Sequence, residues 1–264
     1  MARAGRETIR YGGDTASVEV RGEDGTTLLL DAGSGLLRAA AGLRGVKRID
    51  LLITHLHMDH VQGLGFFPQL RQAEVETHIW GPISTTETLE ERLRRYLSPP
   101  LFPVRLRDLE EVHLHDVGPG TYEIGSFLVT ADLIIHPGST LGFRIQESGG
   151  GILAYLPDHE PALGHSEFEA ERRWTSGFDL AHDADVLIHD AQYTPEEYEA
   201  RVGWGHSTLA HAITLAARAG AKTLVPFHHD PEHSDDMIDR MLVDADVPDG
   251  LDVVPGKTGL EIEV

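Results

Sequence analysis

The spacing of apolar residues along the chain predicts a series of short buried strands separated by turns and helices. Runs rich in Ile, Val and Leu, bounded by glycine, proline or acidic residues, are typical of such strands. The segments 16–20 and 27–30 flank the glycine-containing turn 22–25, which predicts a hairpin. Further strands are expected at 49–53, 76–80, 122–124, 127–135, 142–146, 152–156, 185–188 and 223–227.

Helical spacing occurs between these strands. Leu89, Leu93 and Leu97 recur at every fourth position among charged residues, which predicts an amphipathic helix over 86–97. A short helix is also expected over 61–70, where two glycines would allow close packing. The chain therefore alternates strand segments with helical segments.

Composition narrows the class of protein. The chain has 264 residues, 41% of them hydrophobic, which suffices for a full core in one large or two modest domains. No apolar run approaches the roughly 18 residues of a membrane span, and the first residues lack the apolar core of a signal peptide. We therefore expect a cytoplasmic protein with no membrane partner.

The lack of cysteine limits the possible chemistry. Without thiolates there is neither a disulfide framework nor a cysteine-bound zinc. Any metal ion must be held by imidazole and carboxylate groups, which favours zinc, manganese or iron.

Acidic residues dominate the charge, with 43 of them against 22 basic ones and a formal net charge of −21. A field of this sign repels polyanions, and proteins that bind nucleic acid usually present a basic face. We therefore expect a small substrate and no large nucleic acid.

The stretch 54–60 reads Thr-His-Leu-His-Met-Asp-His and directly follows the apolar run 49–53. His55 and His57 alternate with an apolar residue, so both project to one side, whereas Asp59 and His60 follow where the chain turns. This spacing suits two neighbouring metal ions. The alternative is a polar turn with solvated histidines, which so many ligand-type side chains in one short stretch disfavour.

Imidazole and carboxylate groups recur at the ends of the later strands. They are His136, Asp158, His189 with Asp190, and His228. One polar strand end is common, but repeated strand ends of this kind indicate a single site to which several strands contribute.

Neighbouring residues keep two interpretations. Asp31 either hydrogen-bonds the histidine loop or caps the following helix, and His159 either lines the site or faces solvent. His113 and His115 alternate within an expected strand and are interpreted as surface residues. Two roles are possible for Trp174, Tyr193 and Trp204: stacking on a base, or packing in the core or at its rim.

These residues resemble the metallo-β-lactamase superfamily. The matching features are the HxHxDH pattern at 55–60, the Asp-Ala-Gly turn at 31–33, and the separate His136, Asp158 and His228. The resemblance covers nearly the whole chain, from about Tyr11 to the end. It implies an α/β fold, an αββα sandwich of two mixed sheets flanked by helices, as a single domain over residues 1–264.

The resemblance also implies a dinuclear metal site. His55, His57 and His136 would hold the first ion, and Asp59, His60 and His228 the second. Asp158 would bridge the two. Two divalent ions are expected, zinc first, with manganese or iron as alternatives.

Two further motifs resemble the phosphodiesterase branch. His189-Asp190-Ala191 resembles the acidic box of tRNase Z, and the segment 205–208 resembles its His-Ser-Thr motif. The resemblance implies that Asp190 orients His206, which would act as general acid, and Asp59 is counted with them as catalytic. The segments 10–15, 98–103, 189–193 and 203–208 resemble the anti-Pycsar enzymes, which cleave cyclic mononucleotides.

The sequence thus predicts a metal-dependent phosphodiesterase that hydrolyses a small phosphodiester, most plausibly a cyclic mononucleotide, with a metal-bridging hydroxide. The alternatives are a tRNase Z-like endoribonuclease, a cyclic sugar-phosphate phosphodiesterase and a non-catalytic protein that binds metal or nucleotide. A homodimer is expected from the resemblance, and the apolar segment 101–104 would suit a contact across it.

Overall fold

The computed structural model describes residues 2–163 and 174–264 of the chain. These residues form two compact units. The N-terminal unit comprises Asp14–Gly118 and Ile124–Ser126, and the C-terminal unit comprises Met1–Gly13, Pro119–Glu123 and Phe127–Val264. A single domain over residues 1–264 stays a prediction.

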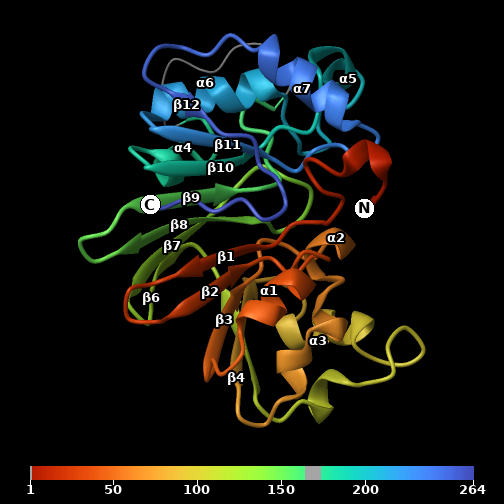
Figure 1. The fold of residues 1–264 in the computed structure, drawn as a ribbon. Helices are drawn as coiled ribbons and strands as arrows, with labels where there is room; N and C mark the ends of the chain where they lie inside the picture. The colour runs from red at the N-terminus through yellow and green to blue at the C-terminus, as the bar shows by residue number, and fades with distance from the viewer. Residues whose placement is uncertain (1, 164–173) are drawn as a thin grey trace. The chain divides into compact units, whose positions relative to one another are not determined.

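The N-terminal unit is built on a five-stranded sheet with the order β1-β2-β3-β4-β5 (Figure 1). β1 and β2 pair antiparallel as the expected hairpin, and the pairs β2–β3, β3–β4 and β4–β5 are parallel. The strands are β1 (Val18–Arg21), β2 (Thr27–Leu30), β3 (Arg48–Leu52), β4 (Glu76–Pro82) and β5 (Val112–Val117). The helices are α1 (Leu36–Gly42), α2 (Met58–Val61) and α3 (Leu89–Tyr96), with 3-10 turns η2 (Leu64–Phe66), η3 (Pro68–Arg71) and η4 (Leu106–Asp108).

The prediction of a helix over 61–70 is wrong. α2 ends at Val61, and two 3-10 turns follow it. Gly63 explains the change, because its N–H donates to the Ala32 carbonyl and a Cβ there would lie 2.2 Å from the Gly33 carbonyl oxygen. The chain thus packs against the turn after β2 instead of continuing as a helix.

The amphipathic helix is confirmed with a later start. Thr88 accepts a hydrogen bond from the Glu91 backbone N–H, and Glu91 returns one to the Thr88 backbone, so a capping box sets the first turn of α3 at Leu89. Leu89 and Leu93 are buried in the core of this unit, together with Leu36 of α1.

The C-terminal unit is built on a seven-stranded sheet with the order β12-β11-β10-β9-β8-β7-β6. β7–β8 and β8–β9 pair antiparallel, whereas β9–β10, β10–β11 and β11–β12 are parallel. The strands are β6 (Gly120–Ile124), β7 (Phe127–Leu133), β8 (Leu141–Glu147), β9 (Ile152–Leu156), β10 (Val186–Asp190), β11 (Thr223–Phe227) and β12 (Asp252–Val253). The helical elements are η1 (Arg6–Thr8), α4 (Phe178–Ala181), α5 (Pro195–Glu199), α6 (Leu209–Ala219) and α7 (Asp235–Val243).

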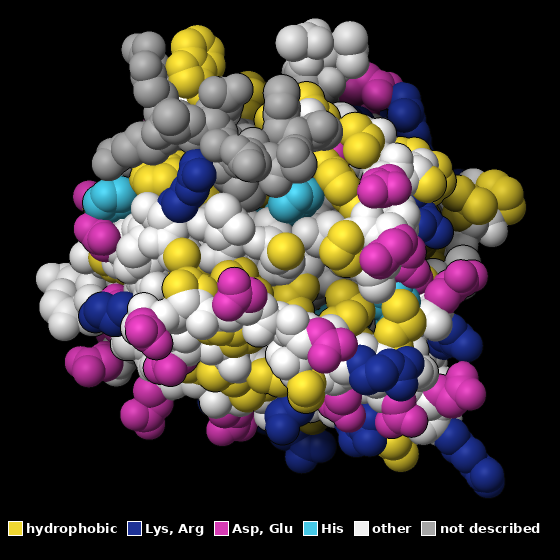
Figure 2. Space-filling view, turned by 90° about the horizontal axis from the view of Figure 1, so that it is seen from above, with side chains coloured by type: hydrophobic (Ala, Val, Ile, Leu, Met, Phe, Trp, Pro, Cys, Tyr) yellow, Lys and Arg dark blue, Asp and Glu magenta, His cyan; other side chains and the backbone are white. Residues whose placement is uncertain are grey.

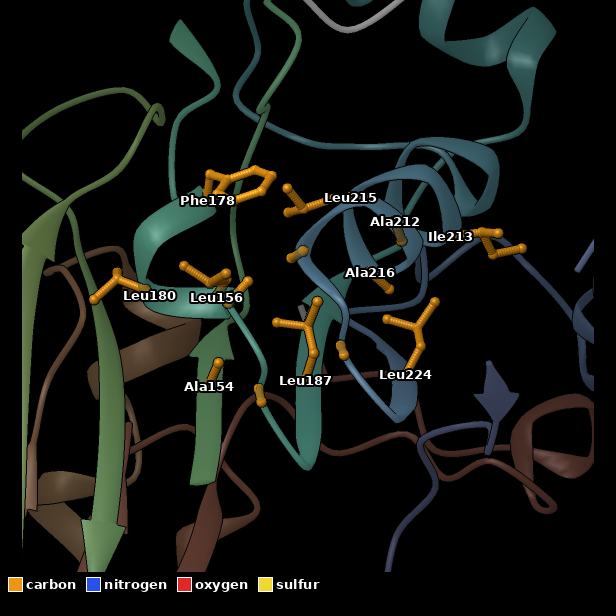
Figure 3. Packing of buried hydrophobic residues seen from close by; sticks show 14 of the residues in the cluster. Ala154, Leu156, Phe178, Leu180, Leu187, Ala212, Ile213, Leu215, Ala216 and Leu224 are labelled. Atoms are coloured by element: carbon orange, nitrogen blue, oxygen red, sulfur yellow. The ribbon is translucent and has the colours of Figure 1, made fainter. Parts of the chain in front are cut away.

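The core of the C-terminal unit lies between α6, α4 and the parallel strands. Leu187 of β10 and Leu224 of β11 point towards Ala212 and Ala216 of α6, and α4 adds Phe178 (Figure 3). Small alanines on α6 let its backbone approach the sheet closely, while the large side chains of the strands fill the space between. Among the described residues, no helix combines the length and the hydropathy that crossing a bilayer requires.

Parallel pairing explains why polar strand ends gather within each unit. In the N-terminal unit Asp31 follows β2 and the stretch 54–60 follows β3, at the same edge of the sheet. In the C-terminal unit Asp158 follows β9, Asp190 ends β10 and His228 follows β11. The carboxyl ends of adjacent parallel strands meet at one edge, which is where α/β sheets bind ligands.

Candidate metal centre

The stretch after β3 gathers its imidazoles within the N-terminal unit. The His55 ring lies 4.4 Å from that of His57 and 4.2 Å from that of His60, between ring centroids. Asp59 and His60 lie in the first turn of α2, with 4.0 Å between the nearest carboxylate oxygen and His60 Nε2. His55 and His60 are buried.

Asp31 supports this cluster from behind. Its buried carboxylate accepts hydrogen bonds from the Thr54 N–H and hydroxyl and from His60 Nδ1, at 2.8, 3.0 and 2.8 Å. Of the two interpretations left open by the sequence, the contact with the histidine loop is the one observed. Asp31 also has φ of 59°, a conformation rare for a residue with a side chain, which is typical of functional sites.

Replacing Asp31 by asparagine should weaken metal binding by about 10- to 100-fold, as for other groups that orient a ligand histidine. The amide –NH₂ would face the Nδ1–H of His60 or force His60 into the other tautomer, with its proton on Nε2. Calorimetric titration with zinc measures this change, and Asp108→Asn, an exposed carboxylate of the same unit, is the matched control. Equal zinc affinity for Asp31→Asn and the wild type would contradict the orienting role.

Asp158 lies between two histidines of the C-terminal unit. One carboxylate oxygen is 3.7 Å from His136 Nε2 and the other is 3.4 Å from His228 Nε2. Ligand atoms on one tetrahedral ion with bonds of 2.0–2.2 Å lie about 3.3 Å apart, so both separations suit metal ligands. An Asp with one histidine on each oxygen suits the bridging position that the family resemblance implies for Asp158.

The hydrogen bonds of these histidines fit metal binding. His60 Nδ1 donates to Asp31, His136 Nδ1 donates to the Gly205 carbonyl at 2.7 Å, and His228 Nδ1 lies 3.0 Å from the Gln192 amide oxygen. Each contact places the proton on Nδ1 and therefore the lone pair on Nε2, the tautomer that ligates through Nε2. The donor set of imidazoles and carboxylates, without sulfur, suits zinc, manganese or iron.

His206 and Asp190 form the closest polar pair of this set. His206 Nδ1 donates to Asp190 Oδ2 at 2.6 Å, and Asp190 also accepts from the backbone N–H groups of Gln192 and Ser207. Asp190 is fully buried, whereas the His206 side chain is 14% exposed. The carboxylate thus both fixes the turn and orients the imidazole, and His206 Nδ1 lies 4.0 Å from Asp158.

The sequence did not reveal Glu160, which holds the loop that carries His206. Its buried carboxylate accepts hydrogen bonds from the N–H groups of Gly203 and Gly205 and from the Tyr198 hydroxyl, at 2.9, 2.8 and 2.8 Å. Gly205 has φ of 86°, and a Cβ there would lie 2.4 Å from His136 Nδ1. The carboxylate and this glycine together fix the backbone beside both His136 and His206.

Replacing Glu160 by glutamine should lower kcat by about 10- to 100-fold, the loss expected from a small misplacement of a catalytic group. The glutamine amide has only one acceptor oxygen, so it can no longer accept one hydrogen bond from each glycine N–H group on a separate oxygen. The loop that positions His206 must therefore shift. Steady-state kinetics with KM and kcat resolved measures the effect. Tyr198→Phe, which removes only the third hydrogen bond, is the matched control, and an equal loss in both variants would contradict the specific role of the glycine contacts.

The other histidines near the site have supporting contacts. His159 is buried, and its Nδ1 lies 2.9 Å from His189 Nε2, so the solvent-facing interpretation is wrong. Burial lowers the pKa of His159 well below its usual value and that of His189 to about 4. Since His189 Nδ1 donates to the Asp190 carbonyl, neutral His189 accepts from His159. His229 lies against the Tyr11 ring, 5.4 Å between centroids, which supports the turn at His228.

The aromatic residues divide between core and surface. Tyr193 is 2% exposed and packs edge-on against His206, which excludes base stacking, while burial raises its pKa to about 12. Trp174 and Trp204 are 66% and 60% exposed. Trp204 lies in the sequence between Gly203 and Gly205, the two glycines whose N–H groups bind Glu160, and it is two residues from His206. Its exposed indole is open to a ligand.

Comparison with known proteins relates the chain to a hydrolase superfamily. A family model described as beta-lactamase superfamily domain matches residues 26–229. Ribonuclease BN of Cronobacter sakazakii is 28% identical over 260 residues, which cover 82% of this chain and 83% of that protein.

Two solved structures show the fold. The metallo-β-lactamase fold protein YhfI from Bacillus subtilis has a TM-score of 0.69 and 20% identity, covering 94% of this chain and 91% of that one. Human tRNase Z, short form, has a TM-score of 0.66 and 21% identity, covering 98% and 95%. The α/β fold with two mixed sheets and flanking helices is therefore confirmed.

These relatives correct the expectation that no large nucleic acid would be a partner. Proteins similar to this chain in sequence carry the names ribonuclease BN and ribonuclease Z, so RNA is within the range of the family. The net charge was a poor guide to the substrate because it is a property of the whole chain. Bound metal ions add positive charge at the site, which is where a phosphate would bind. Acidic and basic side chains are interspersed on the face seen in Figure 2.

Proposed function

Because the chain belongs to the β-lactamase superfamily, we propose that it is a metal-dependent phosphodiesterase whose substrate is a small phosphodiester, a cyclic mononucleotide in the first place. The family identifies the chain as a metal-dependent hydrolase. The observation that carries the proposed reaction is the Asp190–His206 pair, 2.6 Å apart and within 4.0 Å of Asp158.

The proposed metal ligands are those that the family resemblance implies. His55, His57 and His136 would hold one ion and Asp59, His60 and His228 the other, with Asp158 as the bridge. The motif supports this assignment, and so do the tautomers within each unit, which place lone pairs on Nε2 of His60, His136 and His228. Bound as zinc, the ions would supply a hydroxide at neutral pH and would neutralise charge on the phosphoryl oxygens.

The proton for the leaving group is assigned to His206. As oxygen adds to phosphorus, the ester P–O bond breaks, and an alkoxide leaves poorly unless it is protonated. With Nδ1 bonded to Asp190, protonated His206 would give its Nε2 proton to the leaving oxygen. The buried carboxylate of Asp190 stabilises the cationic imidazole and fixes its orientation.

Two features favour a nucleotide. The segments 10–15, 98–103, 189–193 and 203–208 resemble enzymes that cleave cyclic mononucleotides. The exposed Trp204 offers a ring on which a base can stack, and such stacking contributes about 1–3 kcal/mol per base. A tRNase Z-like endoribonuclease is the second candidate, favoured by the names of the relatives.

A homodimer is part of the proposal. Leu101 is 68% exposed, while its neighbour Phe102 is 9% exposed and packs in the core of the N-terminal unit. Within the segment 101–104, Phe102 thus packs in the core, and Leu101 is exposed where it could contact a second copy of the chain.

A substrate panel tests the proposed function. Metal-reconstituted protein would be assayed against 3′,5′-cyclic mononucleotides, cyclic dinucleotides, pre-tRNA and bis-p-nitrophenyl phosphate. We expect turnover of a cyclic mononucleotide to the ring-opened monophosphate. Cleavage of pre-tRNA alone would support the endoribonuclease, and turnover of the artificial ester alone would contradict the nucleotide assignment.

A further inference from the structure

A second group of histidines lies on the sheet of the N-terminal unit, apart from the stretch 54–60 in the sequence. Along β4, Thr77 and Ile79 are buried, so Glu76, His78 and Trp80 project to the other face. On β5, Leu114 packs against the core, and His113 and His115 project to the same face as His78. The sequence alone indicated two surface histidines here and gave no partner for them.

The parallel register brings three ligand-type groups together. His78 pairs with His113 across the two strands, and Glu76 precedes His78 by two residues on the same face. The carboxylate Oε1 of Glu76 lies 2.9 Å from His78 Nε2 and 3.7 Å from His113 Nε2. Each of the three residues offers one ligand atom, and these atoms lie within 4.8 Å of one another.

We propose that Glu76, His78 and His113 form a zinc site separate from the candidate metal centre. A tetrahedral zinc ion with bonds of 2.0–2.2 Å holds its ligand atoms about 3.3 Å apart. Zinc would therefore replace the hydrogen bond between Glu76 and His78, which is 2.9 Å long, and draw His113 closer to Glu76 than the present 3.7 Å. Two imidazoles and one carboxylate match the donors that zinc takes in the absence of cysteine, and a water would complete the tetrahedron.

His115 orients the most buried of the ligands. Ligation through His78 Nε2 requires the proton on Nδ1, and His115 Nε2 lies 2.8 Å from His78 Nδ1, ready to accept it. His115 in turn stacks on Trp80, with 3.9 Å between centroids and 16° between planes. Such outer contacts fix the tautomer and the ring orientation of a ligand histidine.

Partly buried polar contacts hold this support in place. The Trp80 indole N–H donates to Asp50 at 2.9 Å, and the guanidinium of Arg48 donates to both carboxylate oxygens of Asp50 at 2.8 and 2.9 Å. Asp50 is 1% exposed. The site therefore rests on a fixed wall of side chains from β3, β4 and β5, as preorganised binding requires.

The proposed ligands are open to solvent on one side. The side chains of Glu76 and His113 are 47% and 46% exposed, and that of His78 is 12% exposed, so an ion enters from solvent. β5 lies at the end of the strand order. An ion bound across β4 and β5 would tie this edge strand to the sheet and leave the reaction unchanged.

Zinc stoichiometry tests the site independently of activity. Metal-depleted protein would be saturated with zinc, freed of loosely held ions by gel filtration and analysed for zinc per chain. His113→Gln and Glu76→Gln should each bind one ion fewer than the wild type, and His182→Gln, a partly exposed histidine of the C-terminal unit, should bind the same number. Equal zinc content in the wild type and both ligand variants would overturn the proposal.

A positioning variant separates ligation from loss of fold. His115→Phe keeps a ring against Trp80 but removes the acceptor for His78 Nδ1, so zinc affinity at this site should fall by about 10- to 100-fold. Calorimetric titration of the wild type and His115→Phe measures it. Unchanged zinc affinity in His115→Phe would contradict the orienting role of His115.

Discussion

Replacement of His206 by alanine is expected to lower turnover of an alkyl phosphodiester by about 100- to 10,000-fold without loss of bound metal. The imidazole is held by Asp190 at 2.6 Å through Nδ1, which directs its other nitrogen away from the carboxylate. Removing it leaves the proposed ligands in place. The measurement is kcat together with the metal content of each preparation.

The leaving group makes this test specific. A p-nitrophenolate leaves without protonation, so His206→Ala should retain most of its activity on bis-p-nitrophenyl phosphate while losing activity on a cyclic mononucleotide. His182→Gln, a partly exposed histidine whose Nδ1 is 3.1 Å from Asp183, should behave as the wild type on both substrates. Equal losses on the two esters would contradict the role of proton donor, and loss of metal together with activity would make His206 a ligand instead.

Replacement of Asp158 by asparagine is expected to reduce both metal affinity and activity by more than about 100-fold. Groups that only orient a ligand contribute 10- to 100-fold, and a bridging carboxylate should contribute more. Its two oxygens lie 3.7 and 3.4 Å from Nε2 of His136 and His228, and an amide there would offer one oxygen and lose the negative charge. Metal content and initial rate are measured on the same sample.

The control for Asp158 is Asp132→Asn, an exposed carboxylate at the end of β7 in the same unit. This variant should keep full metal content and rate. If Asp158→Asn kept its metal and lost only activity, Asp158 would act on the substrate rather than on the ions. If it kept both, the bridging assignment would be wrong.

Much of the fold and most of the candidate residues were predictable because they depend on local pattern. Apolar runs placed β3, β9, β10 and β11, and the polar residues after them gather because these strands pair in parallel. The pattern itself could not show which strands are neighbours. The helix over 61–70 failed because Gly63 packs against the Gly33 carbonyl, a contact between segments distant in the sequence.

The residues that support the sites were less predictable, because their contacts also join segments that are distant in the sequence. Glu160 binds backbone N–H groups 43 and 45 residues away, and backbone groups leave no signature in the sequence. His78 and His113 were not linked because their proximity depends on the register of β4 and β5. The expectation about nucleic acid failed because net charge describes the whole chain and not one site.

The most direct test of the account is the initial rate of cyclic mononucleotide hydrolysis by metal-depleted protein, as zinc is returned in known equivalents. The account predicts no turnover before zinc is added, a rate that rises as zinc binds, and the ring-opened monophosphate as product. A rate that is unchanged by removal of the metal, or zinc-loaded protein that leaves every cyclic mononucleotide intact, would contradict it.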